Sequence, residues 1–231
     1  MILKPFGQNI WTADGAEVVA ALGFHYPIRM AVIRLAGGDL FVWSPVALTE
    51  GLRAEVDALG EVRHLVAPNA LHHLFVAEWK AAWPAARIYA APGLQQKRDD
   101  LEIDHELDGA ALHIWSKEID HVVVGGNLIT SEVVFFHHGS GTVIFTDLIQ
   151  QLPRGWFTGW RAVVARLDLM MGPEPSVPRK FRAAFTSRDT ARTAVRRILA
   201  WPARQVLMAH GTPVTQDSRA FLKRAFSWLR A

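Results

Sequence analysis

Short apolar runs alternate with helical patterns along this chain, and this alternation constrains the fold more than any other feature. Met30–Leu35 and Leu40–Trp43 flank a Gly37-Gly38-Asp39 turn and predict a β-hairpin. Thr49 is a residue type that caps helices and Gly60 one that ends them, so we expect a helix between the two. The pattern then predicts a strand over 62–67, a helix over 72–83 and a strand over 87–90.

The second half of the chain repeats this order of elements. Short strands are predicted over 112–115 and 122–124, and a Gly139-Ser140-Gly141 turn predicts a hairpin of 132–136 with 142–146. A Trp- and Arg-rich helical segment follows at about 151–200, interrupted by three prolines between 173 and 178. A last strand, Val206–Ala209, leads into a final helix. We therefore expect an α/β fold, a sandwich of two halves in one domain over residues 1–231.

The composition limits the chemistry and the location of the protein. The chain has no cysteine, so any metal has to be bound by nitrogen and oxygen atoms. No apolar run approaches the length of about 18 residues of a membrane span, and the amino terminus lacks the pattern of a signal peptide. We expect a cytoplasmic protein that does not bind membranes.

Basic residues outnumber acidic ones only slightly, 25 to 22, and the excess lies late in the chain. Such a run can contact nucleic acid or an anionic substrate, but acidic and apolar residues interrupt it, which favours a solvated helix face. The basic residues concerned are Arg179, Lys180, Arg182, Arg188, Arg192, Arg196, Arg197 and Arg204.

Polar residues of the kinds that bind metals directly follow three predicted strands. His72 and His73 come after strand 62–67, Asp147 after strand 142–146, and His210 after the last strand. Loops at the carboxyl ends of strands converge in α/β proteins, so these side chains can form a metal site. Singly, each has an ordinary structural role: His72 can cap a helix, His73 can pack inside the protein, and Asp147 can stabilise a turn.

Four stretches of the chain resemble an uncharacterised domain family related to the metallo-β-lactamase superfamily: Tyr26–Met30, Val66–Asn69, His72–Phe75 and Ile144–Leu148. The order of elements is similar over nearly the whole chain. The resemblance implies a four-layered αβ/βα sandwich with a metal site at one edge.

The metal-binding motif of that superfamily, His-x-His-x-Asp-His, is only partly present. Pro68 and Ala70 stand where its first two histidines would be, and Asn127 lies near the position of a further histidine. The resemblance therefore implies that one of two metal positions is lost. It implies that the other holds one divalent metal, zinc first and iron or manganese as alternatives. The ligands that the resemblance implies for this ion are His72, His73, Asp147 and His210.

Four further residues are expected near this site or its substrate. Asn69 is one residue out of register with a lost histidine and is expected to support the site or to cap a helix, and Asn127 is the nearest polar residue to another lost ligand. Trp156 and Trp160 belong to a segment that can form a pocket wall, although packing on the sandwich or in a homodimer is the favoured alternative. His137 and His138 lie roughly 20 Å from Asp147 along the predicted hairpin and are not expected to be ligands.

These features predict a metal-dependent hydrolase that acts on a small-molecule ester, lactone, amide or phosphodiester. Asp147 and His72 are the candidate catalytic residues, and His72 can serve as a base instead of a ligand. The lost motif positions favour an alternative, a catalytically degenerate fold that binds a ligand or a protein. Processing of nucleic acid is the least favoured of the three hypotheses.

Overall fold

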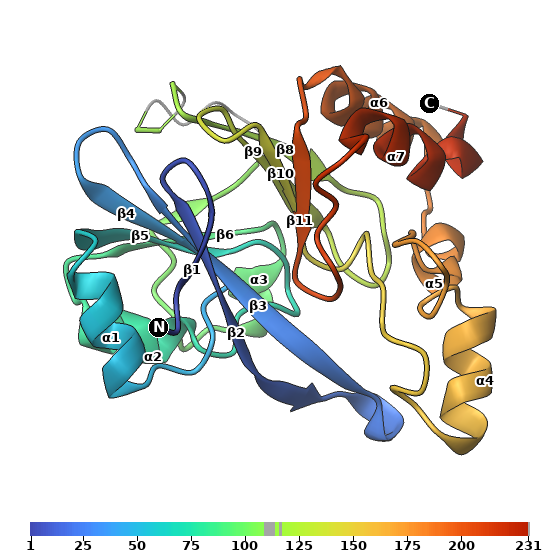
Figure 1. Ribbon diagram of the computed structural model, residues 1–231, viewed down its shortest axis with the longest axis horizontal. Coiled ribbons are helices and arrows are strands. Elements are labelled where there is room, and N and C mark those ends of the chain that lie inside the picture. Colours follow the sequence, from blue (N-terminus) through green and yellow to red (C-terminus); the bar gives the residue numbers. More distant parts are fainter. Residues whose placement is uncertain (109–113, 116, 231) are drawn as a thin grey trace.

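The computed structural model describes residues 1–108, 114–115 and 117–230, and two β-sheets form its centre (Figure 1). The larger sheet has seven strands in the order β1-β2-β3-β4-β5-β6-β7. Neighbouring strands are antiparallel from β1 to β4 and parallel from β4 to β7. The strands are β1 (Lys4–Gly7), β2 (Ile10–Val19), β3 (His25–Arg34), β4 (Asp39–Trp43), β5 (Glu61–Ala67), β6 (Arg87–Ala90) and β7 (His105–Glu106).

The smaller sheet has four strands in the order β11-β10-β9-β8. Strand β10 is antiparallel to β9 and parallel to β11, so β10 and β11 end at the same edge. The strands are β8 (Ile119–Val124), β9 (Glu132–His137), β10 (Thr142–Phe145) and β11 (Gln205–Met208).

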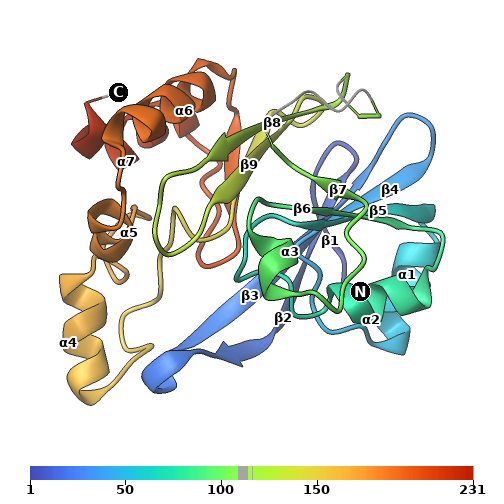
Figure 2. The same cartoon turned by 180° about the vertical axis from the view of Figure 1, so that it is seen from behind.

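The helices lie on the outer faces of the two sheets, with α1 and α2 on one side of the molecule and α6 and α7 on the other (Figures 1 and 2). They are α1 (Glu50–Asp57), α2 (Val76–Ala82), α3 (Leu94–Lys97), α4 (Gly159–Leu167), α5 (Arg179–Ala183), α6 (Arg188–Ala200) and α7 (Ser218–Ala225), with 3-10 turns η1 (Ala21–Gly23) and η2 (Ser227–Leu229). No helix in the described part of the chain is both long and apolar enough to cross a membrane.

Three buried apolar clusters separate four layers of secondary structure. One lies between the sheets and includes Phe41 and Trp43 of the larger sheet and Phe135 of the smaller one. A second packs the larger sheet against α1 and α2, and a third packs the smaller sheet against α6 and α7. Each sheet therefore buries both faces, and the four-layered sandwich that we expected is confirmed.

Most predicted elements are present. The hairpin of β3 and β4, the hairpin of β9 and β10, and strands β5, β6 and β11 lie where the sequence predicts them. The Thr49 side chain accepts a hydrogen bond from the Leu52 N–H at the start of α1, as the capping pattern predicts. Of the strand predicted over 112–115, residues 112 and 113 lie outside the described residues, and Ile114 and Trp115 form a turn.

Several features differ from the sequence prediction. Strand β2 was not predicted, because Asp14, Gly15, Ala16 and Glu17 are residue types with low strand propensity, and strands β1 and β7 and helix α3 were not predicted either. The second helix begins at Val76 and not at the histidine pair. The Asn69 side-chain oxygen accepts hydrogen bonds from the N–H groups of residues 71 and 72, and this local turn replaces the first helical turn. The segment at 151–200 contains three helices, α4, α5 and α6.

Candidate metal centre

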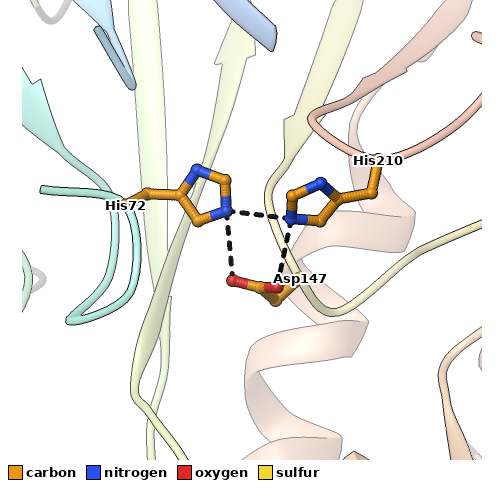
Figure 3. A group of neighbouring side chains, drawn as sticks. All are labelled: His72, Asp147 and His210. Carbon is orange, nitrogen blue, oxygen red and sulfur yellow. Dashed lines mark hydrogen bonds and ion pairs between the residues drawn. The ribbon is translucent and has the colours of Figure 1, made fainter. Parts of the chain in front are cut away.

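The loops after β5, β10 and β11 bring His72, Asp147 and His210 together, with the three side chains pointing at one another (Figure 3). The two Nε2 atoms are 3.1 Å apart. The Asp147 carboxylate faces both rings, with Oδ2 3.4 Å from His72 Nε2 and Oδ1 3.4 Å from His210 Nε2. We call these three residues the metal cluster. Of the described residues, they form the group of histidine and acidic side chains close enough to hold one ion.

The two sheets meet at this edge, and their contacts place the loops. The Val133 N–H at the start of β9 donates to the Pro68 carbonyl after β5, so the loop that carries His72 is joined to the smaller sheet. Arg29 of β3 donates to the carbonyls of Met208 and Gly211 on either side of His210. A backbone hydrogen bond and the Arg29 side chain therefore fix two of the three loops.

Hydrogen bonds orient both imidazole rings so that Nε2 faces the cluster. His210 Nδ1 lies 2.6 Å from the Pro27 carbonyl oxygen, which can only accept, so in the neutral ring the proton is on Nδ1 and Nε2 carries a lone pair. His72 Nδ1 lies 2.8 Å from the Ser44 hydroxyl, which can donate or accept. The Tyr26 ring packs beside His210, with ring centroids 5.4 Å apart.

Amide groups hold the Asp147 carboxylate from its outer side. Asn69 Nδ2 donates to Oδ2 at 2.7 Å, and Gln150 Nε2 donates to Oδ1 at 2.9 Å. Beneath this loop lies the buried Glu132 carboxylate, which accepts backbone N–H groups from Thr146, Asp147 and Leu148 at 2.8 to 3.0 Å. Glu132 thus fixes the turn that presents Asp147 to the two rings.

The electrostatic environment keeps the cluster in the forms that bind metals. Burial lowers the pKa of His72, which favours the neutral ring. Burial alone would raise the pKa of Asp147, but the His72 and His210 rings outweigh it and hold this pKa well below its usual value. Burial and the nearby Asp147 charge raise the pKa of Glu132 to about 7. Metals bind neutral imidazole and ionised carboxylate, so the expected protonation states suit a ligand set.

The spacing of the donor atoms also fits a small cation. Nitrogen and oxygen ligands about 2.0–2.2 Å from a tetrahedral zinc ion lie about 3.3 Å from one another. The distances of 3.1 and 3.4 Å in the metal cluster have this size. Two imidazoles and one carboxylate without thiolate suit zinc, iron or manganese. The arrangement therefore supports a divalent metal.

The metal cluster lines a cavity of about 330 Å³ whose walls are mostly apolar. Such a volume lies within the range of small-molecule sites, and a few polar groups in an apolar cavity are typical of them. The walls consist of Val18, Val19, Ala20, Tyr26, Ile28, Ser44, Pro45, Leu71, Leu74, Phe75, Ile129, Gln150, Lys180 and Phe181.

Some of the residues predicted for this site lie elsewhere. His73 is buried outside the metal cluster: its Nδ1 accepts a hydrogen bond from Arg98 at 2.9 Å, and burial followed by the charges of Lys97 and Arg98 lowers its pKa to about 4. Asn127 donates to the Phe181 carbonyl and does not line the cavity.

The two tryptophans of the predicted wall do not line the cavity either. Trp156 donates to the His25 carbonyl, and Trp160 packs on Phe24. Trp156 packs against a small apolar cluster on the sandwich, whereas Trp160 is 51% exposed. Asn69 does contact Asp147, as expected for a supporting residue.

Several residues that shape the site were not predicted from the sequence. Ser44, Glu132 and Gln150 contact the metal cluster or its loop, and Lys180 lines the cavity. Gln150 lies three residues after Asp147 and could have been found by that spacing. Glu132 begins a strand in which all other residues are apolar except the last, and this is a usable signal for a buried carboxylate.

Comparison with solved structures shows the fold. A metallo-β-lactamase from Pontibacter korlensis is similar over 99% of this chain and 98% of its own, with a TM-score of 0.65 and 11% identity. The metallo-β-lactamase FIM-1 from Pseudomonas aeruginosa in its mono-zinc form covers 98% of this chain and 94% of its own, with a TM-score of 0.61 and 14% identity. A flavodiiron core from Synechocystis sp. PCC6803 covers 99% of this chain and 60% of its own, with a TM-score of 0.63 and 12% identity.

At these identities the structures show a shared fold, that of the metallo-β-lactamases, and not a shared activity. Comparison with curated proteins gives no match. One protein family matches the sequence over residues 7–166, which is more than half of the chain and includes His72 and Asp147 but not His210. The resemblance to an uncharacterised family related to the metallo-β-lactamases is thus confirmed, and the chain belongs to the family described as the domain of unknown function DUF4336.

Proposed function

We propose that this chain is a hydrolase that uses one divalent metal ion, zinc in the first place, held by His72, Asp147 and His210. One observation carries the proposal: two imidazole nitrogens and a carboxylate converge within 3.1 to 3.4 Å at the wall of a mostly apolar cavity. The substrate classes that fit this chemistry are esters, lactones, amides and phosphodiesters. A structural relative described in a mono-zinc form supports a single-ion site on this fold.

A divalent ion at this place supplies a Lewis acid that polarises a carbonyl or phosphoryl oxygen and acidifies water. The chain's own residues prepare the site for it. The Pro27 carbonyl fixes the His210 tautomer, Ser44 orients His72, and the two amides orient Asp147. Because these partners are themselves held by the two sheets, the donor atoms need little reorganisation when an ion binds.

Asp147 is the carboxylate that lines the cavity, and its low pKa keeps it ionised, as a metal ligand has to be. In the hydrolysis that we propose, water adds to the acyl carbon or the phosphorus, and the bond to the leaving oxygen or nitrogen breaks. The leaving group takes up the proton that the water loses. We assign His72 as a ligand and not as a separate base, because its Nε2 faces the same point as His210 Nε2.

The histidine pair provides a matched test of the metal site. His72→Ala is expected to reduce metal from about one ion per chain to near zero after desalting, because a donor atom of the cluster is lost. His73→Ala is expected to retain the ion, because His73 contacts Arg98 outside the cluster. Elemental analysis of the two purified variants measures the metal content of each. Loss of metal in both variants, or in neither, would contradict the ligand set.

A non-catalytic binding module is the second candidate, and the replacement of two motif histidines by Pro68 and Ala70 favours it. The two functions differ in turnover. We expect metal-loaded wild-type protein to hydrolyse at least one member of a panel of chromogenic esters, lactones and phosphodiesters, and Asp147→Asn to lose that activity. A protein that holds metal but hydrolyses none of the panel would favour the binding module.

A further inference from the structure

A second groove, of about 670 Å³, adjoins the cavity beside the metal cluster. Ala20, Tyr26 and Lys180 line both spaces, so the two lie next to each other. The groove lies between the β2–β3 connection and the helices α4 and α5, which Figure 1 shows near one another at the lower right of the molecule. Arg161 of α4 donates to the Leu22 carbonyl and joins the two sides.

Apolar side chains in this groove are exposed to an unusual degree. Leu22 is 74% exposed, Leu167 61% and Val164 42%, and Val19 at the edge of the cavity is 73% exposed. Single exposed apolar residues are common on protein surfaces, but a continuous run of them that leads to a polar site is typical of ligand binding. A substrate with an apolar chain would bury these side chains, whereas a small polar substrate would leave them in water.

The junction between the cavity and the groove carries positive charge. Lys180 Nζ lies 3.3 Å from the Tyr26 hydroxyl and 3.5 Å from Asp168 Oδ2. Arg179 also lines the groove, so two cationic side chains stand against one carboxylate there. Tyr26 contacts both Lys180 and the His210 ring, and Lys180 lines the same cavity as the metal cluster. An anionic group on the substrate would balance the excess charge.

We propose that the substrate is an anionic amphiphile, an ester with an alkyl chain and a carboxylate or phosphate near the scissile bond. Its scissile bond lies at the metal cluster, its anionic group pairs with Lys180, and its chain runs past Tyr26 along the groove to Leu167. Water adds to the acyl carbon and the carbon–oxygen bond to the alcohol breaks, giving an acid and an alcohol. This substrate class rests on the proposed hydrolase function.

Binding of alkanoates to metal-loaded protein tests the proposal without turnover. Hexanoate, octanoate and decanoate are titrated by calorimetry, with decan-1-ol as the uncharged probe. We expect the affinity to rise about threefold to fourfold for each added methylene, as for burial of a chain in an apolar site. Equal affinities for the three acids would overturn the role of the groove.

Two pairs of variants test which side chain binds the anionic group and which binds the alkyl chain. Lys180→Met is expected to weaken binding of decanoate about tenfold and to leave decan-1-ol unchanged, because a charge-assisted contact is lost. Lys223→Met, an exposed lysine on α7, serves as its control and is expected to change neither. Leu167→Gln is expected to flatten the dependence on chain length, whereas Leu128→Gln, at an 80% exposed leucine outside both spaces, is expected to preserve it.

Metal content is measured on the same samples, so the two proposals can fail separately. Protein that retains metal but shows no dependence on chain length overturns the substrate class and leaves the hydrolase. Protein without metal that still binds longer chains more tightly overturns the hydrolase. Equal effects of Lys180→Met on decanoate and decan-1-ol overturn the pairing of Lys180 with an anion.

Discussion

Strands β10 and β11 carry a buried polar cluster at each end, and the two clusters differ in how their hydrogen bonds are satisfied. At the ends of the strands lies the metal cluster. At their starts lie His137, Ser140, Thr142 and Gln205, which we call the hairpin cluster. The Ser140 hydroxyl is 2.8 Å from His137 Nδ1 and 2.5 Å from the Thr142 hydroxyl, and Gln205 donates to Thr142 at 2.9 Å.

The hairpin cluster is complete without a ligand. The hydrogen bonds can all be donated in one direction: Gln205 donates to Thr142, Thr142 to Ser140, and Ser140 to the neutral His137 ring. Each of these groups therefore has a partner. With both rings neutral, the metal cluster has more acceptors than protons. His210 Nε2 and both Asp147 oxygens are acceptors, and at most one proton on His72 Nε2 lies among them.

The difference teaches how to separate a structural polar cluster from a ligand site. Burial is similar in the two clusters, and both contain histidine, so neither feature distinguishes them. What distinguishes them is the surplus of acceptors in the metal cluster, because converging lone pairs in a buried place are stabilised by a cation.

The largest expected effect is that variants of the two clusters change different properties, metal content in one and stability in the other. His210→Ala is expected to lose the metal while the chain stays folded. His137→Ala is expected to retain the metal but to lower the free energy of unfolding by about 1–3 kcal/mol, because a buried hydrogen-bonded ring is removed. Elemental analysis and urea unfolding of both variants measure the two effects. Retention of metal in His210→Ala would remove the basis of the comparison.

Glu132→Gln is expected to have the next largest effect. An amide has one oxygen in place of two, so the turn of Thr146–Leu148 loses acceptors for its buried N–H groups and Asp147 is less well placed. Replacing a residue that supports a metal ligand typically weakens metal binding about 10–100-fold. Competition with a fluorescent zinc chelator measures the affinity.

Glu118→Gln is the control for Glu132→Gln. Glu118 also accepts a backbone N–H, from Ala36, but this hydrogen bond is exposed and joins other elements. We expect the metal affinity of Glu118→Gln to equal that of the wild type. A similar loss in both variants would show that Glu132 acts on stability in general and not on the metal loop.

The sequence predicted those parts of the fold that local patterns determine. Hairpins with Gly-rich turns and strands with an apolar centre, such as β9 and β10, have a recognisable pattern in the sequence. Strand β2 does not, because Asp14 to Glu17 resemble a turn. In the structure Asp14 and Gly15 pair with Arg29 and Ile28 of β3, and the register shifts before Val18. Long-range pairing therefore decides what propensity leaves open.

For the candidate site, position after a strand predicted which loops converge but not which side chain of a pair points inward. His72 and His73 have the same sequence environment, and the Asn69 turn and Arg98 separate them only in the folded chain. Ser44 lies 28 residues from His72, and no local pattern connects the two. The assignment of the cluster as metal ligands is a prediction that the experiments above test.

The smallest expected effect is on the pH dependence of stability, which the hairpin cluster contributes through His137. Burial, and then the charge of His138, lowers the pKa of His137 to about 4 from an ordinary value of 6.5. Between these values the unfolded chain binds a proton that the folded chain does not, so stability falls as the pH drops from 6.5 to 4.

His137→Gln can keep a hydrogen bond to Ser140 but binds no proton. The free energy of unfolding of this variant is therefore expected to fall less steeply as the pH drops over this range. The difference in slope should correspond to somewhat under one bound proton. Urea unfolding at pH 4.5 to 7 in the presence of a chelator measures the slope without the contribution of metal. The pKa of His64 is also lowered to about 4, but His64 contributes equally to both proteins, so the difference isolates the hairpin cluster. Equal slopes would mean that His137 takes up its proton in the folded chain. The hairpin cluster would then no longer be the closed, neutral counterpart of the metal cluster.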